Sequence, residues 1–357
     1  MVHAHLMTLL PFPPDVEVAI VSHNNMASLP AAVDSLLAAG CPERDITVVD
    51  VASTDNTATW LATEHPAIRH RRLDFNNGPD PGRNIGITEA TRPFVLLMDA
   101  DVIIEPNTVQ RLHAAMVADR RVRIGSPIVV HASRPDVIQY AGGALHFICE
   151  AINPWIDRPL AERGTAPADI DCAPTCALLL DRATAIDIGL FDERYFIGKE
   201  DGDFTHRCRL ADYVIRELPD ALVRHHSRPR GTWLFYYQIR NRWHFMLKNY
   251  QWRTLIAIIP CLMIHEPLQF AVLVMKGHSR TYFKAVRGIV EMLPDLGRDR
   301  AVMHRIRRVS DASLLRTGHL IVREDLASGV LARLGKSAYE GFLNGYWRLL
   351  RATVFRR

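Results

Sequence analysis

Five apolar residues run directly into two aspartates in Phe94-Val95-Leu96-Leu97-Met98-Asp99-Ala100-Asp101. An apolar run of this length is typical of a strand covered on both faces, as in a parallel sheet. Because side chains alternate along a strand, Asp99 and Asp101 point the same way at its carboxyl end. Two like charges held this close favour a bound cation, and Mg²⁺ and Mn²⁺ prefer carboxylate oxygens. The segment therefore predicts a metal–diphosphate site, the alternative being an acidic loop after a strand.

Strands and helices are expected to alternate over the first hundred residues. The apolar and β-branched runs predict strands over 16–21, 46–51, 68–73 and 94–98, with helices over 29–39, from a cap at Thr54 or Asp55 to about Thr63, and over 81–91. This alternation predicts an α/β fold with a mostly parallel central sheet flanked by helices on both faces. Ligands of such sheets bind at the carboxyl ends of the strands, which here carry Ser22-His23-Asn24, Asp50 and the two aspartates.

Two familiar phosphate-binding motifs are missing from the sequence. No Gly-x-Gly-x-x-Gly follows the first strand, and no Gly-Lys-[Ser/Thr] phosphate loop is present. This argues against a dehydrogenase and against a P-loop enzyme. A nucleotide would have to be held by side chains and a metal.

Charge is divided unevenly along the 357 residues, whose net charge is +4. From Arg240 to the end there are 21 Lys and Arg against 8 Asp and Glu, whereas the preceding part holds 22 and 31. The division suggests an acidic, metal-using front part and a back part that meets anions. Six scattered cysteines indicate free thiols in a reducing compartment. Residues 1–14 predict a loose tail without a signal peptide, so we expect a cytoplasmic protein.

The stretch from Thr254 to Met275 contains no Lys or Arg and is nearly long enough to span a membrane. Its Glu266-Pro267 break predicts two short apolar helices that lie in, or dip into, one leaflet, with a buried helical hairpin as the alternative. Lysines and arginines follow, so we expect an anionic membrane surface as partner. No nucleic-acid-binding module is recognised, and nucleic acid is not expected.

Two further groups are candidates for chemistry. Glu200-Asp201-Gly202-Asp203 opens a predicted helix after the aromatic pair Tyr195-Phe196. Acidic side chains are favoured at a helix N-terminus, which accounts for Asp203 but poorly for Glu200 and Asp201. His225-His226 follows another expected strand, and neutral histidine is a common metal ligand.

Taken together, these segments resemble family 2 glycosyltransferases with the GT-A fold, over roughly residues 16–250. His23 stands where the family often has Tyr, and Val51 follows Asp50 where the family usually continues with Asn. The part after Arg240 is similar to bacterial members that glycosylate membrane-linked or surface-polysaccharide acceptors. We therefore expect a tail over 1–14, a GT-A domain over 15–250, and a helical, basic, membrane-associated region over 251–357. The matching pieces are 21–24, 49–55, 77–78 with 83–86, 99–101, 189–193, 200–203, and 219–221 with His225.

The resemblance implies a reaction and a role for each matched residue. Family members transfer a sugar from a nucleoside diphosphate donor to an acceptor hydroxyl with inversion at the anomeric carbon, using Mg²⁺ or Mn²⁺. Asp101 would bind the metal, Asp99 the ribose, the metal or its water, and His225 the metal, with His226 as second choice. Asp201 would be the catalytic base, with Glu200 as second choice. The donor-binding candidates are Ser22, His23, Asn24, Asp50, Arg83 and Asn84.

The partners implied are a nucleoside diphosphate sugar, a glycan, lipid-linked or other hydroxyl acceptor, and the inner face of the cell membrane. Two other functions stay open. A sugar nucleotidyltransferase would need a Gly-rich, basic loop after the first strand, which Ser22-His23-Asn24-Asn25 does not provide. A non-catalytic, membrane-associated scaffold with a transferase-like fold would not need Asp99, Asp101, Asp201 and His225 together.

Overall fold

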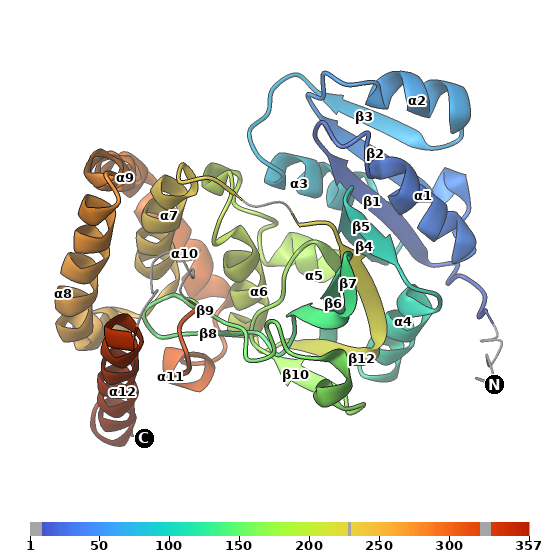
Figure 1. Cartoon of the computed structure of the whole chain (residues 1–357). Coiled ribbons are helices and arrows are strands. Elements are labelled where there is room, and N and C mark those ends of the chain that lie inside the picture. The colour runs from blue at the N-terminus through green and yellow to red at the C-terminus, as the bar shows by residue number, and fades with distance from the viewer. Residues whose placement is uncertain (1–8, 228–229, 322–329, 357) are drawn as a thin grey trace.

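The computed structural model describes residues 9–227, 230–321 and 330–356 (Figure 1). Residues 1–8, where most of the expected tail falls, lie outside the described residues. The elements that build the sheet and its cover are β1 (Val16–Ser22), α1 (Leu29–Ala38), β2 (Ile46–Val51), α2 (Thr57–Glu64), β3 (Arg69–Leu73), α3 (Asp80–Glu89), β4 (Phe94–Asp99), β5 (Val102–Ile104), α4 (Thr108–Ala118), β6 (Val122–His131), β7 (Arg134–Tyr140), β10 (Ala168–Ile170), β11 (Ala177–Asp181), α5 (Arg182–Asp187), α6 (Glu200–Leu210) and β12 (Val214–His225).

One large sheet has the strand order β10-β12-β6-β11-β4-β1-β2-β3. The four expected strands, β1 to β4, are all parallel neighbours in it. Farther along the order the sheet is mixed, because β11 lies antiparallel between β4 and β6, while β6 and β12 are parallel. The mostly parallel α/β fold expected from the sequence is confirmed.

Helices cover both faces of this sheet. Leu96 and Met98 of β4 pack into a core with α1, α2 and α4, whereas Val95 and Leu97 pack on the opposite face with α3, α5 and α6. The apolar run before Asp99 is therefore buried on both sides, as its composition predicts. On the second face α3 approaches β1 closely, since a Cβ added at Gly86 would lie 2.4 Å from the Cβ of Ala19.

The C-terminal part is helical and packs on a core of its own. Its helices are α7 (Leu234–Asn249), α8 (Trp252–Met275), α9 (Ser279–Met292), α10 (Leu296–Ile306), α11 (Asp311–Leu314) and α12 (Val330–Thr353), at the left of Figure 1. The short pair β8 (Ala144–Leu145) and β9 (Ala151–Ile152) borders this core. At its centre are Phe147, Phe245 and Trp347, with the rings of Phe147 and Trp347 stacked 4.8 Å apart. All six cysteines are buried and free, as expected.

The expectation of two short apolar helices around Pro267 is wrong, because α8 is one continuous helix with Pro260 and Pro267 inside it. Each proline removes the N–H that would bond to the carbonyl four residues earlier, at Ile256 and Met263. All four of these residues are exposed, so water reaches the carbonyls that lose their partner. The opposite side of α8 packs into the C-terminal core, which holds the helix together across both prolines. The alternative of a buried helical hairpin is also wrong, because α8 is one helix with an exposed side. Among the described residues, α8 is the helix long and apolar enough to cross a membrane.

Buried ion pairs join the helical part to the sheet. Lys248 Nζ on α7 lies 2.7 Å from Asp203 Oδ1 on α6 and 2.8 Å from Asp192 Oδ2. Arg207 also pairs with Asp203, at 2.9 Å. Burial raises the pKa of Asp203, but Lys248 and Arg207 lower it more, so the net pKa lies below the usual range. These ion pairs are buried, so water could not replace a lost partner if α7 moved. The position of α7 therefore depends on them.

We expect Lys248→Met to reduce the free energy of unfolding by about 3–5 kcal/mol, because it removes the buried cation that Asp192 and Asp203 share. Among the described cations, Asp203 then keeps only Arg207, and Asp192 keeps only Arg194. Lys284→Met, on the exposed side of α9, is the matched control and should change it by less than about 0.5 kcal/mol. Denaturant unfolding followed by circular dichroism measures both. Because the folded pKa of Asp203 is lowered, its ion pairs stabilise the fold above the unfolded pKa of about 3.9 and lose this effect as pH falls. Equal stability of the two variants at neutral pH would contradict the assignment.

Candidate active site

The site is built at the carboxyl ends of the strands, where β4 is fixed from both sides. The backbone N–H of Asp99 donates to the carbonyl of Cys176 at 2.9 Å, and that of Ala100 donates to Val21 at 3.1 Å. Ala100 is fully buried. The two aspartates are therefore held by backbone contacts on either side of a buried alanine.

His225 is brought to Asp101 by strand pairing. β12 runs antiparallel to β5, and the register sets His225 opposite Val102, the residue after Asp101. His225 Nε2 lies 3.5 Å from Asp101 Oδ1. The other ring nitrogen, Nδ1, lies 2.9 Å from Gln139 Oε1 on β7, so it donates its hydrogen there. By contrast, His226 is exposed, and its backbone N–H donates to the carbonyl of Asp101.

This arrangement fits a divalent cation that shares its coordination with a bound diphosphate. In the neutral tautomer with hydrogen on Nδ1, His225 Nε2 and Asp101 Oδ1 are two electron-pair donors 3.5 Å apart, as two ligands of one cation would be. Among the residues that the structure describes, no group of three or more His, Cys, Asp or Glu side chains is placed to hold a metal by itself. Mg²⁺ is commonly held by only one or two carboxylates plus substrate phosphates, so this small donor set suffices.

Arg83 connects the two acidic groups of the site. Its guanidinium, only 4% exposed, lies between Asp80 Oδ1 at 3.1 Å, Asp99 Oδ1 at 3.2 Å and Asp201 Oδ1 at 3.7 Å. One face of the guanidinium packs on the buried ring of Phe191, with the Arg83 Cζ atom 5.5 Å from the ring centroid. One buried cation thus brings together the end of β4 and the start of α6, which are about a hundred residues apart in sequence.

Asp201 and Glu200, adjacent in sequence, have opposite environments. The side chain of Asp201 is 38% exposed, and the Thr175 hydroxyl donates to its Oδ1. Glu200 is 6% exposed, and within the described residues its Oε2 has no hydrogen-bond partner. Burial raises the pKa of Glu200 to about 8, with the charges of Asp201 and Asp80 adding to the rise. Burial and these neighbouring charges therefore favour the protonated form of Glu200.

The carboxyl ends of β1 and β2 form the other side of the site. Asp50 is fully buried, its Oδ1 accepting from the backbone N–H of Ser53 at 2.8 Å and its Oδ2 from Arg72 Nη1 at 2.5 Å. His23 Nδ1 donates to the carbonyl of Val51 at 2.6 Å, so Nε2 is left as an acceptor. Asn24 adopts a left-handed backbone, and its N–H donates to the Ser53 hydroxyl.

Asn84 and Ser22, two residues predicted to bind the donor, are both buried. The side chain of Asn84 is tied to the loop before α6: its Oδ1 accepts from the N–H of Phe191 at 2.8 Å, and its Nδ2 donates to Glu193 Oε1 at 2.8 Å. Ser22, at the end of β1, is buried, and within the described residues its hydroxyl has no partner. Asn84 therefore supports the loop that carries Phe191 beneath Arg83.

The structure adds four residues that sequence reasoning did not find. Asp80 precedes Arg83 by three residues on α3, a spacing that indicates an ion pair on one helix face. Arg72 and Asp50 are directly opposite in the β2–β3 register. Gln139 and Thr175 have no comparable sequence signal, because β7 and the loop before β11 reach the site through tertiary pairing.

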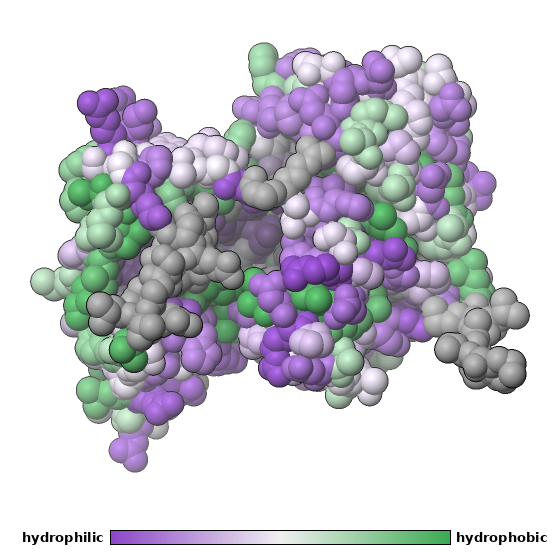
Figure 2. Space-filling view, in the orientation of Figure 1, coloured by the Kyte–Doolittle hydropathy of each residue, from purple (hydrophilic) through white to green (hydrophobic). Residues whose placement is uncertain are grey.

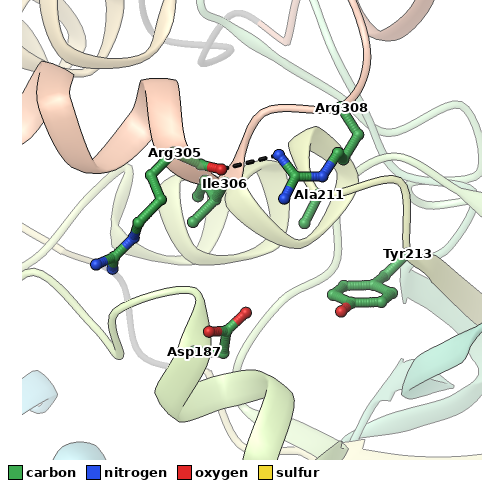
Figure 3. A pocket seen from close by; sticks show the side chains of 6 residues that line it. All are labelled: Asp187, Ala211, Tyr213, Arg305, Ile306 and Arg308. Atoms are coloured by element: carbon green, nitrogen blue, oxygen red, sulfur yellow. Dashed lines mark hydrogen bonds between the residues drawn. The ribbon is translucent and has the colours of Figure 1, made fainter.

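Two hollows lie away from this centre. A small pocket of about 120 Å³ is lined by Asp187, Ala211, Tyr213, Arg305, Ile306 and Arg308 (Figure 3). A second, of about 490 Å³, is lined by Asn84, Phe191, Asp192 and Lys248 among others. Apart from Asn84, neither is lined by a predicted site residue.

Comparison with known proteins finds a matching family model and several similar sequences. Residues 17–185 match the model of the family described as Glycosyl transferase family 2. The succinoglycan biosynthesis protein ExoO of Rhizobium meliloti (strain 1021) is 30% identical over 139 residues, which are 39% of this chain and 38% of that protein. The N-acetylglucosaminyl-diphospho-decaprenol L-rhamnosyltransferase of Mycobacterium tuberculosis (strain ATCC 25618 / H37Rv) is 27% identical over 211 residues, 52% of this chain and 68% of the relative.

Solved structures show the same fold at low sequence identity. The crystal structure of GalNAc-T7 with UDP, GalNAc and Mn²⁺ aligns with a TM-score of 0.54 and 18% identity, covering 69% of this chain and 49% of that one. That of S. aureus TarS 1-349 aligns with a TM-score of 0.50 and 17% identity, covering 94% and 91%. This likeness confirms the GT-A type fold. The chain spans less than half the length of ExoO and of GalNAc-T7. Residues 17–185, a little under half of the chain, thus match glycosyltransferase family 2.

Proposed function

We propose that this chain is an inverting, metal-dependent glycosyltransferase that moves a sugar from a nucleoside diphosphate to an acceptor hydroxyl. The observation that supports this most strongly is the contact of Arg83 with both Asp99 and Asp201. It sets an exposed carboxylate beside the aspartate pair after β4, as displacement at an anomeric carbon between donor and acceptor requires. Asp101 beside His225 supplies the second half of the site.

The donor side of the site holds the leaving group. Asp101 and His225, with Asp99, would hold Mg²⁺ or Mn²⁺, and the bound ion would supply the positive charge that stabilises a diphosphate leaving group. Arg83 offsets the charge of Asp99 and holds that carboxylate in place beside the donor. His23, Asn24 and Asp50 surround the base and ribose at the ends of β1 and β2, next to the buried Ser22.

The acceptor side removes one proton. Asp201 is the general base, because it is partly exposed and has its carboxylate fixed by Thr175, whereas Glu200 is buried in surroundings that raise its pKa and favour its protonated form. A one-step inversion needs only this base. Glycoside hydrolysis by contrast uses two carboxyl groups, one of which protonates the leaving group.

The relatives indicate the class of donor and acceptor. GalNAc-T7 was crystallised with UDP, GalNAc and Mn²⁺, which supports a nucleotide sugar and a divalent ion. One relative is named for transfer to N-acetylglucosaminyl-diphospho-decaprenol, and another for succinoglycan biosynthesis. We therefore propose a lipid-linked or glycan hydroxyl acceptor in cell-surface glycan assembly. The basic C-terminal region then meets the anionic inner face of the cell membrane, so the enzyme is cytoplasmic and peripheral.

A donor screen tests the proposed function directly. Thermal unfolding is measured with Mn²⁺ and each of a set of nucleotide sugars, and the cognate donor should raise the midpoint by mass action. Hydrolysis of the same donor by the full chain then reports turnover. If no nucleotide sugar shifts unfolding and none is hydrolysed, the non-catalytic scaffold is the better interpretation.

The two neighbouring histidines offer a matched test of the metal site. His225→Ala should weaken binding of Mn²⁺ in the presence of a nucleoside diphosphate by roughly 10–100-fold, because it removes a ligand beside Asp101. His226→Ala should leave binding unchanged. Titration calorimetry with the ion measures both, and Asp101→Ala should resemble His225→Ala. Equal losses from the two histidine variants would rule out the assignment.

The base is tested at Asp201. Asp201→Asn keeps the hydrogen-bonding shape but cannot take a proton, so transfer from the cognate donor should fall by about 10²–10⁴-fold while donor binding persists. Glu200→Gln, which preserves a neutral side chain, should cost much less. Asp34→Asn, on the exposed side of α1, is the matched control. Near-normal turnover by Asp201→Asn would remove Asp201 from the mechanism.

A further inference from the structure

The outer side of α8 carries a continuous row of exposed apolar side chains. Trp252, Ile256, Ile259 and Met263 follow one another at the i, i+4, i+7, i+11 spacing of one helix face, and Met263 is 71% exposed. Val274 continues this row toward the end of the helix, and Leu268 and Met275 are exposed at its edge. Figure 2 shows hydrophobic side chains along the left edge of the molecule, where Figure 1 places α8. A soluble monomer rarely exposes so long an apolar row without a function.

α9 continues this surface. Phe283, Val286 and Val290 follow at i, i+3 and i+7 and are exposed, Phe283 to 63%. The two helices meet through aromatic rings, since the centroids of Phe270 on α8 and Phe283 on α9 are 5.7 Å apart. We call the exposed apolar residues of both helices the α8–α9 face: Trp252, Ile256, Ile259, Met263, Leu268, Val274, Met275, Phe283, Val286 and Val290.

Positive charge borders the α8–α9 face. Lys276, Arg280, Lys284 and Arg287 are all exposed along the start and outer side of α9. Within residues 252–292, all of which the structure describes, the acidic residues are Glu266 and Glu291. Glu266 pairs with the buried Arg242, and Glu291 pairs with Arg287 at 2.9 Å. Long cationic side chains beside apolar ones suit an anionic lipid surface, because their stems lie along the hydrocarbon while their charges reach the headgroups.

The other side of α8 shows that the helix does not cross the bilayer in this fold. Glu266 pairs with Arg242 of α7, and His265 Nδ1 lies 2.9 Å from the Tyr339 hydroxyl on α12. Leu255, Ile258 and Leu262 pack into the C-terminal core. Spanning would carry this buried charge pair and the helices packed on α8 into hydrocarbon. A helix with one side packed on protein and one side apolar lies in the plane of the interface.

We propose that the α8–α9 face is a docking surface that inserts into a single leaflet of an anionic membrane. Trp252 and Phe283 enter near the level of the headgroups, and Lys276, Arg280, Lys284 and Arg287 contact the anionic lipids. This docking rests on the membrane contact proposed above and is independent of sugar transfer. It assigns a definite surface to the membrane contact and makes the enzyme monotopic.

Vesicle flotation with the full chain tests this surface. We expect the protein to float with vesicles of phosphatidylcholine mixed with phosphatidylglycerol, and less with phosphatidylcholine alone. The double variant Met263→Glu/Phe283→Glu should lower the bound fraction by about tenfold or more, because two charges replace inserted side chains. Val117→Glu, an exposed apolar position on α4, is the matched control and should float as wild type. Lys284→Glu/Arg287→Glu should reduce flotation only with the anionic vesicles.

Folding and self-association are followed in the same samples. All substituted side chains are exposed, so the thermal unfolding midpoint of each variant should stay within about a few degrees of that of the wild type. Light scattering reports the oligomeric state. The proposal is overturned if the wild-type chain does not float, or if the double variant floats as well as wild type. It is also overturned if the wild type is a dimer that Met263→Glu converts to a monomer, because a second copy then covers the face.

Discussion

The Arg83 guanidinium is buried among the carboxylates of Asp80, Asp99 and Asp201, and the candidate active site depends on that contact. Without a cation, three carboxyl groups at this distance would repel one another or take up protons. Burial in fact raises the pKa of Asp80 to about 7 even with Arg83 present. The guanidinium therefore holds the end of β4 beside the start of α6 and keeps the acidic centre compact.

The helical part is joined to this centre by a second set of buried charges. Lys248 on α7 reaches Asp203, two residues after Asp201, and Asp192, in the loop that Asn84 also holds. Displacement of α7 would expose these carboxylates and disturb the start of α6. Helices α8 and α9 pack on α7 and the C-terminal core, so the proposed docking surface and the proposed catalytic base share one support.

Much of the fold was predictable because its signals are local. Strands β1 to β4 and helices α1 to α3 follow from apolar runs and turn residues that act within a few positions. α8 was the exception: Pro267 indicates a break in an isolated helix, but packing of one side against the C-terminal core keeps the helix continuous. The sequence likewise indicated Asp101, Asp201 and His225 as candidates, with Glu200 as second choice for the base and His226 as second choice for the metal ligand.

By itself, the sequence determined the alternating α/β pattern, the carboxylates at the ends of the strands, and the apolar and basic character of the C-terminal region. These properties depend on residue type and spacing, which the chain carries in any conformation. Only the tertiary structure decided that Gln139 faces His225, that Thr175 fixes Asp201, and that Glu200 is buried while Asp201 is partly exposed. Strand register, burial and electrostatic environment arise between segments far apart in sequence, so no local pattern contains them.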